Sequence, residues 1–275
     1  LKPDRYAVVG NPIAHSKSPE IHQLFAEQTG EIISYEKILL EPDNFINDVT
    51  DFFKSGGKGL NVTVPFKVDA YNFVTQHTNY AKHAGAVNTI IPQQDNSYLG
   101  ANTDGIGLLR DLKKKLRLQI ADKKILIIGA GGATQGIVEP LLLEHPCELL
   151  IANRTLEKAV ALAKKFKEVG NIQSCGLDQI PTSAYNLILH ATSAAVKHED
   201  IELPSEIIAS HSCCYDLSYS DTNTPFMQWA KKNGAQLVID GLGMLIEQAA
   251  ESFYLWRGKR PDTTMVYNNL RPVSE

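Results

Sequence analysis

The chain has 275 residues, 43% of them hydrophobic and 21% charged, which is typical of a folded globular protein. Its net charge of −4 argues against binding to nucleic acids or anionic membranes. No apolar run approaches the roughly 20 residues of a transmembrane helix, and no signal peptide is recognisable. The four cysteines show no zinc-ligand spacing, so we expect reduced cysteines, no bound metal and a cytoplasmic protein.

The first hundred residues alternate between predicted strands and helices. Ser18 is expected to cap the first helix, with Pro19 at its first position and Gly30 after its end. Strands separated by helices predict a sheet built from β-α-β units. The strands are expected at 5–10, 32–40, 59–64 and 86–92, and the helices at 18–30, at 42–57 and from Pro65 onward.

From Asp104 onward, strands and helices alternate at the spacing of a doubly wound parallel sheet. The helix at 242–256 is predicted to pack back on the first domain. We therefore expect a first domain of residues 1–103 completed by 241–275, and a second domain of residues 104–240. In the second domain, strands are expected at 123–129, 147–155, 185–193, 213–219 and 236–241, and helices at 104–116, 133–145, 155–170 and 224–234.

A glycine-rich turn, "GAGGA" at 129–133, joins a strand to a helix. Glycines let the backbone approach a pyrophosphate, and the free N–H groups of a helix N-terminus attract its negative charge. The pattern predicts dinucleotide binding, although Thr134 stands where the G-x-G-x-x-G fingerprint has its third glycine. A glycine-rich turn without a ligand is the structural alternative.

The end of the next strand indicates which dinucleotide binds. NAD enzymes tend to carry an acidic residue there, which binds the ribose 2′-hydroxyl. Here the segment is Asn153, Arg154 and Thr155, with Lys158 one helical turn further on. This cationic cluster suits a 2′-phosphate and favours NADP. Alternatively, Arg154 and Lys158 are solvated charges, but positive charge at a helix N-terminus opposes the helix dipole.

The segment "NVTVPFK" at 61–67 begins as a strand and ends at a lysine. Asn61 and Thr63 share one face of the strand, and Lys67 follows in the first turn of the predicted helix. A helix N-terminus disfavours an ammonium charge, so Lys67 is a candidate for proton transfer. A solvent-exposed lysine is the alternative.

Other strand and loop ends repeat this polar character. Asn88 lies in "VNT", Asp104 in "NTDG", and Ser16 and Ser18 in the loop before the first helix. Asp104 and Ser18 could instead be simple helix caps. Together, these hydroxyl, amide and charged groups predict a pocket for a polyhydroxylated ligand with one carboxylate. His15 and His22 have no readable partner.

These motifs together resemble those of the shikimate dehydrogenase family. The resemblance covers nearly the whole chain, through "YAVVGNPIAHSKSPEIH", "GGKGLNVTVPFK", "AGAVNT", "GANTDGIG", "LIIGAGGA", "ANRT" and "DGLGMLIEQAA". It implies an α/β fold in which a cleft separates an N-terminal α/β substrate domain from a C-terminal Rossmann-like domain. The implied activity is NADPH-dependent reduction of 3-dehydroshikimate to shikimate, on the pathway to chorismate and the aromatic amino acids.

The resemblance also implies roles for individual residues. The catalytic pair falls on Lys67 and Asp104. The substrate contacts fall on Ser16, Ser18, Asn61, Thr63, Lys67, Asn88, Asp104, Tyr219 and Gln248. The NADP contacts fall on Gly129, Ala130, Gly131, Gly132, Ala133, Asn153, Arg154, Thr155, Lys158, Thr192, Leu217 and Gly241.

His190 departs from the family pattern, because it replaces a common asparagine before "ATS". It lies in a predicted core strand, which favours a structural role. Two alternative functions stay open: a quinate/shikimate dehydrogenase that uses NAD or NADP, and a non-catalytic NADP-binding regulatory module. The sequence is compatible with a monomer or a homodimer.

Overall fold

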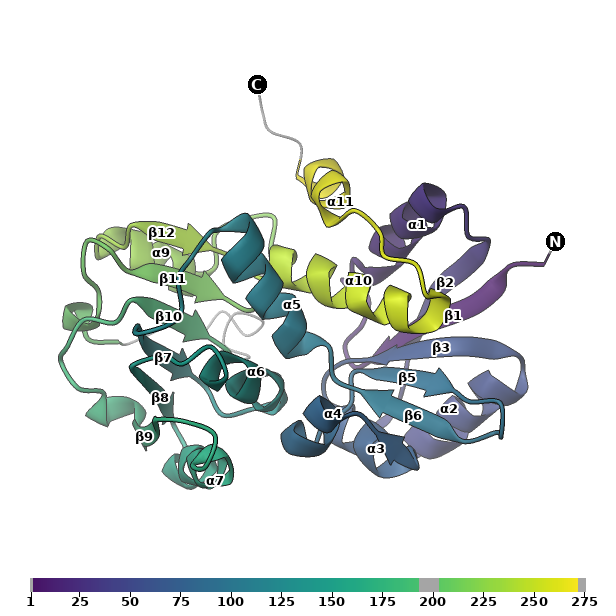
Figure 1. The fold of residues 1–275 in the computed structure, drawn as a ribbon, viewed down its shortest axis with the longest axis horizontal. Coiled ribbons are helices and arrows are strands. Elements are labelled where there is room, and N and C mark those ends of the chain that lie inside the picture. Colours follow the sequence, from purple (N-terminus) through teal and green to yellow (C-terminus); the bar gives the residue numbers. More distant parts are fainter. Residues whose placement is uncertain (1, 193–202, 272–275) are drawn as a thin grey trace. The chain divides into compact units, whose positions relative to one another are not determined.

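The computed structural model describes residues 2–192 and 203–271, and Figure 1 shows their fold. The chain forms two compact units: unit 1 consists of Leu1–Leu108 and Leu245–Glu275, and unit 2 of Leu109–Met244. Each unit contains one six-stranded sheet. The assignment of substrate to the first domain and NADP to the second, with a cleft between them, stays a prediction.

The sheet of unit 1 has the strand order β2-β1-β3-β5-β6-β4. Its strands are β1 (Asp4–Gly10), β2 (Ile33–Leu39), β3 (Gly57–Val62), β4 (Gln76–His77), β5 (Thr89–Pro92) and β6 (Tyr98–Ala101). β1 pairs in parallel with β2 and β3, as β-α-β units require. β5 pairs antiparallel with β3 and β6. The sheet is mixed because residues 93–97 alone join β5 to β6, which allows a hairpin but no crossover.

The helices of unit 1 are α1 (Ser18–Thr29), α2 (Phe45–Lys54), α3 (Lys67–Phe73), α4 (Asn79–Ala84), α5 (Asp104–Arg110), α10 (Leu242–Arg257) and α11 (Thr263–Leu270), of which α5 and α10 continue into unit 2. The expected cap of α1 is wrong. Lys17 takes the N-cap position, and Ser18 is the first helical residue. The hydroxyl of Ser18 bonds the hydroxyl of Ser16 in the preceding loop, and the Ser18 amide donates to the same Ser16 oxygen. Gly30 ends the helix in the left-handed conformation (φ 69°), as expected.

Helix α3 begins at Lys67, two residues after the predicted start. Pro65 lies in the preceding turn, which is closed by a hydrogen bond from Phe66 N to Thr63 O at 3.0 Å. The Lys67 ammonium thus belongs to the first residue of a helix, where the helix dipole opposes its charge. A nearby anion is needed to offset this cost.

Helix α10 is anchored to β1, to β5 and to the loop between α1 and β2. Trp256 Nε1 donates to Ile90 O at 3.1 Å, and Arg257 donates to Asp4 Oδ2 at 2.6 Å and to the Glu31 carboxylate. These contacts join residues more than 160 positions apart in the sequence. The C-terminal part of the chain is therefore an integral part of unit 1.

Unit 2 is a parallel sheet with the strand order β12-β11-β10-β7-β8-β9. The strands are β7 (Lys124–Ile128), β8 (Glu148–Asn153), β9 (Ile172–Gly176), β10 (Leu187–His190), β11 (Cys213–Asp216) and β12 (Leu237–Ile239). Helices α6 (Gly132–Leu142), α7 (Leu156–Phe166) and α9 (Pro225–Lys232) connect them. The predicted doubly wound sheet is confirmed, and β9 is an additional edge strand.

The strand order of unit 2 reverses between β7 and β10. From β7 the chain builds outward through β8 and β9, and it then returns to β10 on the other side of β7. Ligands of doubly wound sheets bind outside the carboxyl ends of the strands at such a switch point. The glycine turn after β7 and Thr192 after β10 both lie there.

All four cysteines are free. Cys213 and Cys214 lie in β11, where burial raises the pKa of each thiol to about 12. Both thiols are therefore protonated at neutral pH and contribute to packing rather than chemistry.

His22 is a core residue of unit 1 and is fully buried. Its ring stacks on Tyr35 with centroids 4.2 Å apart, and Phe25, Phe253 and Trp256 also contact it. Neither ring nitrogen makes a hydrogen bond of standard geometry, although Asn61 lies near enough to oppose part of the effect of burial on the pKa. Burial lowers the pKa of His22 to about 3, so the folded protein holds this ring neutral.

We expect His22 to make unit 1 less stable in acid. An unfolded histidine takes up a proton near pH 6.5, whereas the folded His22 resists protonation down to about pH 3, so stability falls across this window by about 1.4 kcal/mol per pH unit. His22→Phe should remove that contribution. Urea unfolding between pH 7.5 and 5, followed by Trp256 fluorescence in a Trp229→Phe background, measures it. The exposed His211→Gln is the control, and equal pH slopes for wild type and His22→Phe would contradict the prediction.

Candidate active site

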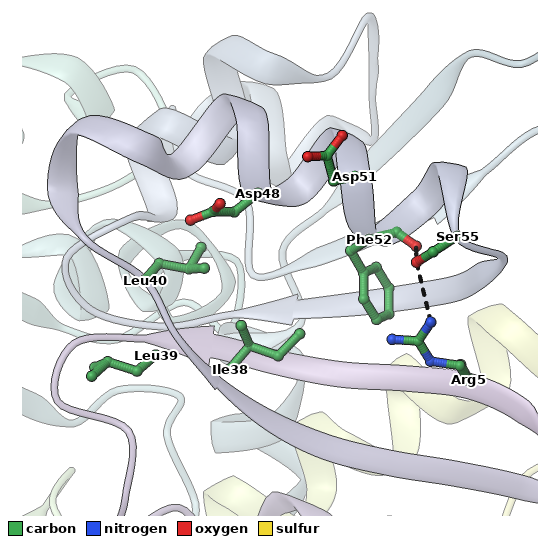
Figure 2. Close-up of a pocket in the computed structure, with 8 residues that line it drawn as sticks. All are labelled: Arg5, Ile38, Leu39, Leu40, Asp48, Asp51, Phe52 and Ser55. Atoms are coloured by element: carbon green, nitrogen blue, oxygen red, sulfur yellow. Dashed lines mark hydrogen bonds between the residues drawn. The ribbon is translucent and has the colours of Figure 1, made fainter.

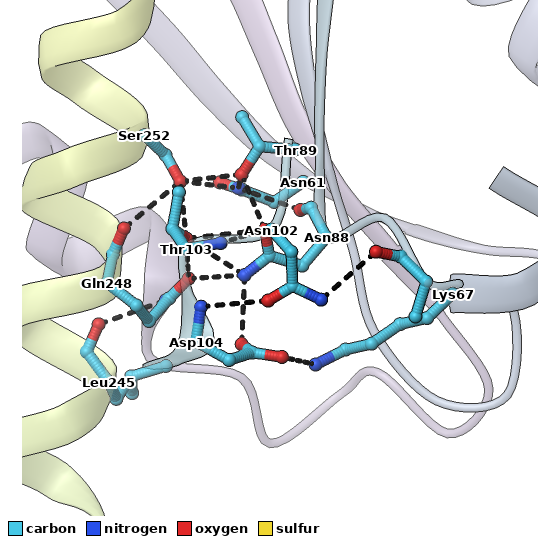
Figure 3. A network of polar contacts seen from close by, with 11 residues as sticks. Asn61, Lys67, Asn88, Thr89, Asn102, Thr103, Asp104, Leu245, Gln248 and Ser252 are labelled. Carbon is cyan, nitrogen blue, oxygen red and sulfur yellow. Dashed lines mark hydrogen bonds and ion pairs between the residues drawn. The ribbon is translucent and has the colours of Figure 1, made fainter. Parts of the chain in front are cut away.

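A network of buried polar side chains connects β3, the start of β5, the start of α5 and α10 (Figure 3). All of these elements supply residues of unit 1. Buried polar groups are costly unless they are hydrogen-bonded, so such a network has few alternative arrangements. Its members are Asn61, Lys67, Asn88, Thr89, Asn102, Thr103, Asp104, Gln248 and Ser252.

Lys67 and Asp104 form an ion pair, with Nζ 2.5 Å from Oδ2. The two side chains are only 12% and 7% exposed. The other carboxylate oxygen of Asp104 accepts from Asn88 Nδ2 at 2.9 Å, and the Asp104 amide donates to Asn102 Oδ1 at 3.1 Å. The carboxylate is thus held by both oxygens, and it holds the ammonium of Lys67 in turn. A partly buried ammonium of fixed position suits proton transfer.

Asn88 is fully engaged by protein groups. Its Oδ1 accepts from Thr103 N and Thr89 Oγ1, both at 2.9 Å. Its Nδ2 donates to Thr103 Oγ1, to Asp104 and to Gln248 Oε1. At 3% exposure, the amide has no freedom to flip. Asn88 therefore fixes the orientation of the Asp104 carboxylate.

Asn61 is held in the same way. Its Nδ2 lies 3.1 Å from three acceptors, namely Asn88 O, Thr89 Oγ1 and Ser252 Oγ, and its Oδ1 accepts from Tyr35 OH at 2.7 Å. The contact of Asn61 with substrate stays a prediction, because both Oδ1 and Nδ2 of the amide bond to protein groups in this structure.

Four members of this network were not predicted as site residues from the sequence, namely Thr89, Asn102, Thr103 and Ser252, and neither was Tyr35, which donates to Asn61. Sequence position could have indicated two of them, because Thr89 directly follows Asn88 and Thr103 directly precedes Asp104. Ser252 lies four residues after Gln248 and so on the same face of α10. The sequence around Tyr35 shows only the alternating pattern of a strand, which does not indicate a place in this network.

The other predicted substrate residues occupy different places. Ser16 Oγ donates to Ser18 Oγ at 3.2 Å in the loop that enters α1. Thr63 follows β3 and lies against Gly10, where its methyl group occupies the space of an added Cβ. Tyr219 belongs to unit 2 and follows β11.

A separate hollow of about 480 Å³ lies in unit 1 between helix α2 and strands β1 and β2 (Figure 2). Arg5 at its edge is held by Glu36, by Ser55 and by the ring of Phe52. None of the predicted site residues lines it, and it is therefore not the candidate active site. The lining residues are Arg5, Ile38, Leu39, Leu40, Asp48, Asp51, Phe52 and Ser55.

The glycine turn of unit 2 has the features of a dinucleotide site. Gly129 has φ +113°, which favours glycine, and Gly131 is the N-cap of α6. A Cβ added at Gly131 or Gly132 would meet nothing within 4 Å, so the backbone there is open to a phosphate. Thr134 Oγ1 donates to Gly129 O at 2.9 Å and thereby closes the turn from within the helix.

The end of β8 supports this turn and carries exposed cations. Asn153 Oδ1 accepts from Ala130 N at 3.1 Å, which ties β8 to the glycine turn. Arg154 and Lys158 are exposed at the start of α7. The open turn and these cations fit a dinucleotide with a 2′-phosphate.

The remaining predicted cofactor residues lie at the carboxyl edge of the same sheet. A Cβ on Gly129 would meet Thr192 Cγ2 at 3.1 Å, and one on Gly241 would meet Leu217 O at 2.1 Å. Thr192 therefore lies beside the glycine turn, and Gly241 packs against the backbone after β11. Within residues 2–192 and 203–271, no helix could span a membrane and no cluster of metal ligands is found.

Three family models match successive parts of the chain. Residues 8–90 match the shikimate dehydrogenase substrate binding domain, and residues 111–207 match shikimate / quinate 5-dehydrogenase. Residues 241–268 match the shikimate 5′-dehydrogenase C-terminal domain. Together these matches cover most of both units.

Relatives of known name extend over nearly the whole chain. A shikimate dehydrogenase (NADP(+)) of Cellvibrio japonicus is 48% identical, over 98% of this chain and 97% of its own. Two solved structures are also similar. An Ael1 enzyme from Pseudomonas putida has a TM-score of 0.90 and 38% identity, covering 97% of this chain and 98% of its own. Shikimate 5-dehydrogenase from Thermus thermophilus, in complex with NADP(H) and shikimate, has a TM-score of 0.84 and 30% identity, covering 95% and 96%.

We expect Tyr35→Phe to destabilise unit 1 by about 1–2 kcal/mol, because it leaves the buried Oδ1 of Asn61 without its donor. Urea unfolding followed by Trp256 fluorescence in the Trp229→Phe background measures the loss. Tyr98→Phe is the matched control, since Tyr98 packs against Phe53 and Phe73 through its ring. Equal losses in the two variants would show that the Tyr35 hydroxyl adds nothing.

Proposed function

Because the chain belongs to the shikimate dehydrogenase family, we propose that it catalyses the reversible NADPH-dependent reduction of 3-dehydroshikimate to shikimate. This reaction lies on the pathway to chorismate and the aromatic amino acids. The observation that carries the proposal is the Lys67–Asp104 ion pair within a buried network of hydroxyl and amide groups. This arrangement supplies a proton donor beside groups that suit a polyhydroxylated substrate.

The two units have different binding roles in this proposal. Unit 1 binds the substrate, because it holds the ion pair and most of the substrate-binding candidates. Unit 2 binds NADP, because its glycine turn, Arg154 and Lys158 suit a pyrophosphate and a 2′-phosphate. Thr155, Thr192, Leu217 and Gly241 complete the proposed cofactor contacts.

The chemistry needs one hydride and one proton. NADPH, when bound, supplies the hydride that reduces the C3 carbonyl group. Lys67 donates the proton from Nζ to the carbonyl oxygen as that oxygen gains negative charge, directly or through a water molecule. In the reverse direction, Lys67 accepts the proton from the C3 hydroxyl.

Asp104 keeps Lys67 in place for this step. Its Oδ2 binds the ammonium at 2.5 Å, while Asn88 holds Oδ1. Side chains that are already oriented need no reorganisation during the reaction. The hydroxyls of Ser16 and Ser18 bind the substrate carboxylate. The remaining substrate groups contact Asn61, Thr63, Asn88, Tyr219 and Gln248.

We also propose that the protein works in the cytoplasm. The four free cysteines, two of them with strongly raised pKa values, fit a reducing compartment. The oligomeric state, monomer or homodimer, stays a prediction.

Lys67→Ala should lower kcat by about 10²–10⁴-fold, because it removes the proton donor. Absorbance at the reduced-nicotinamide band, with shikimate and NADP, measures the loss, and fluorescence titration should show unchanged NADPH binding. Lys82→Ala, at an exposed site in α4, is the control. Turnover in Lys67→Ala equal to wild type would refute the assignment. NADPH binding without shikimate turnover in wild type would indicate a regulatory module, and turnover of quinate with NAD would indicate the broader dehydrogenase.

Arg154→Ala should raise the KM for NADP about tenfold and leave the KM for NAD unchanged, because a charged hydrogen bond to the 2′-phosphate is lost. Steady-state kinetics with both cofactors test this. Lys164→Ala, an exposed cation near the other end of α7, controls for general loss of positive charge. A parallel rise in both KM values would contradict a 2′-phosphate contact.

A further inference from the structure

A buried threonine lies behind the candidate active site, where several of its hydrogen bonds meet (Figure 3). Thr89 is the first residue of β5 and has no exposed surface, so it is out of reach of a bound substrate. We propose that Thr89 is a positioning residue for proton transfer, because its hydroxyl orients Asn88 and, through Asn88, the carboxylate of Asp104. The inference rests on the proposed function and adds one residue to it.

The pairing of β3 with β5 brings Thr89 into the network. The two strands are antiparallel, and their register places Thr89 directly opposite Asn61. Side chains of directly opposite residues lie on the same face of a sheet and within contact distance. Asn61 Nδ2 accordingly lies 3.1 Å from Thr89 Oγ1. Thr89 therefore connects Asn61 on one strand with Asn88, its own neighbour in the chain.

The hydrogen-bond partners of Asn88 show which way the Thr89 hydroxyl points. Asn88 Oδ1 lies 2.9 Å from Thr103 N, a backbone donor, so this atom is the amide oxygen. Because an amide oxygen only accepts, its 2.9 Å contact with Thr89 Oγ1 needs the hydroxyl hydrogen of Thr89. Ser252 is then the donor in its 2.8 Å contact with Thr89. Neither assignment depends on the charge of an ionisable group.

Asn88 transmits this orientation to the ion pair. With Oδ1 held by two donors, Nδ2 points at Asp104 Oδ1, which lies 2.9 Å away. The other carboxylate oxygen binds the ammonium of Lys67. The same segment also holds the backbone of Lys67, since Val87 N donates to Lys67 O at 2.8 Å. Residues 87–89 therefore fix both the ammonium-bearing residue and its counter-ion.

A purely structural Thr89 would stabilise β5 without affecting the reaction. Its loss would then lower the amount of folded protein, and each folded molecule would work at the wild-type rate. A positioning role instead slows proton transfer in protein that is folded. A solvent isotope effect separates the two roles, because heavy water slows the transfer of the proton itself, whereas a smaller folded fraction lowers the rate equally in both solvents.

The test compares Thr89→Ser with Thr89→Ala in the full chain. Both variants lose the methyl group, and only serine keeps the hydroxyl that donates to Asn88. We expect kcat with shikimate and NADP to fall about tenfold in Thr89→Ala and to stay within about threefold of wild type in Thr89→Ser. The ratio of kcat in water to kcat in heavy water should rise in Thr89→Ala only. The Kd for NADPH, measured by fluorescence titration, should be unchanged in both.

Thr89→Val guards against a water molecule that takes the place of the hydroxyl in Thr89→Ala, because its second methyl group fills that space. It should lower kcat at least as much as Thr89→Ala. Urea unfolding shows whether each variant is folded under the assay conditions. Thr50→Ala is the matched control, since the Thr50 hydroxyl donates to Ile46 O within helix α2, and it should leave kcat and the isotope ratio unchanged.

A double variant shows whether Thr89 acts through the ion pair. In the Lys67→Ala background the proton donor is already absent, so Thr89→Ala should lower kcat no further. A further tenfold loss there would show that Thr89 acts by another route and would overturn the inference.

Two other results also overturn it. One is a kcat of Thr89→Ala equal to that of wild type or to that of Thr89→Ser. The other is a lower kcat with an unchanged isotope ratio, which assigns Thr89 to stability alone. In each case wild type still turns over shikimate, so the proposed function stands. Absence of shikimate turnover in wild type would instead overturn the proposed function together with this inference.

Discussion

The candidate active site depends on the need of buried polar groups for hydrogen-bond partners. Asn88 is the centre of this constraint, because one buried amide contacts Thr89, Thr103, Asp104 and Gln248. An unpaired buried polar atom costs about 1–3 kcal/mol, so each partner restricts where the others can lie. This arrangement fixes the position of the Asp104 carboxylate, and the carboxylate in turn fixes the ammonium of Lys67.

The same constraint explains why the end of the chain belongs to unit 1. Gln248 and Ser252 on α10 supply acceptors that Asn61 and Asn88 need. A Cβ on Gly107 would meet the Gln248 backbone at 2.7 Å, so helix α5 and α10 touch directly at this glycine. The Lys67–Asp104 ion pair and helix α10 are therefore parts of one packed structure.

Unit 2 uses a comparable principle at its own site. Thr134 stands where the fingerprint has its third glycine, and its hydroxyl donates a hydrogen bond to Gly129 O across the glycine turn. Asn153 ties the neighbouring strand to the same turn, and Asp216 orients His190. In both units, the proposed ligand-binding groups are held by hydrogen bonds to neighbouring side chains, which reduces the reorganisation that binding requires.

The sequence by itself determined the alternation of strands and helices, the glycine turn, the missing acid after β8 and the family. These features are local, since periodicity and turn chemistry act over a few residues. Only the tertiary structure decided that β5 pairs antiparallel with β3, that Ser18 does not cap α1, and that Tyr35 and Ser252 hold Asn61. Asn61 is 26 positions from Tyr35 in the sequence and 191 positions from Ser252. Hydrogen bonds between such distant side chains leave no local pattern, because folding alone brings their atoms within reach.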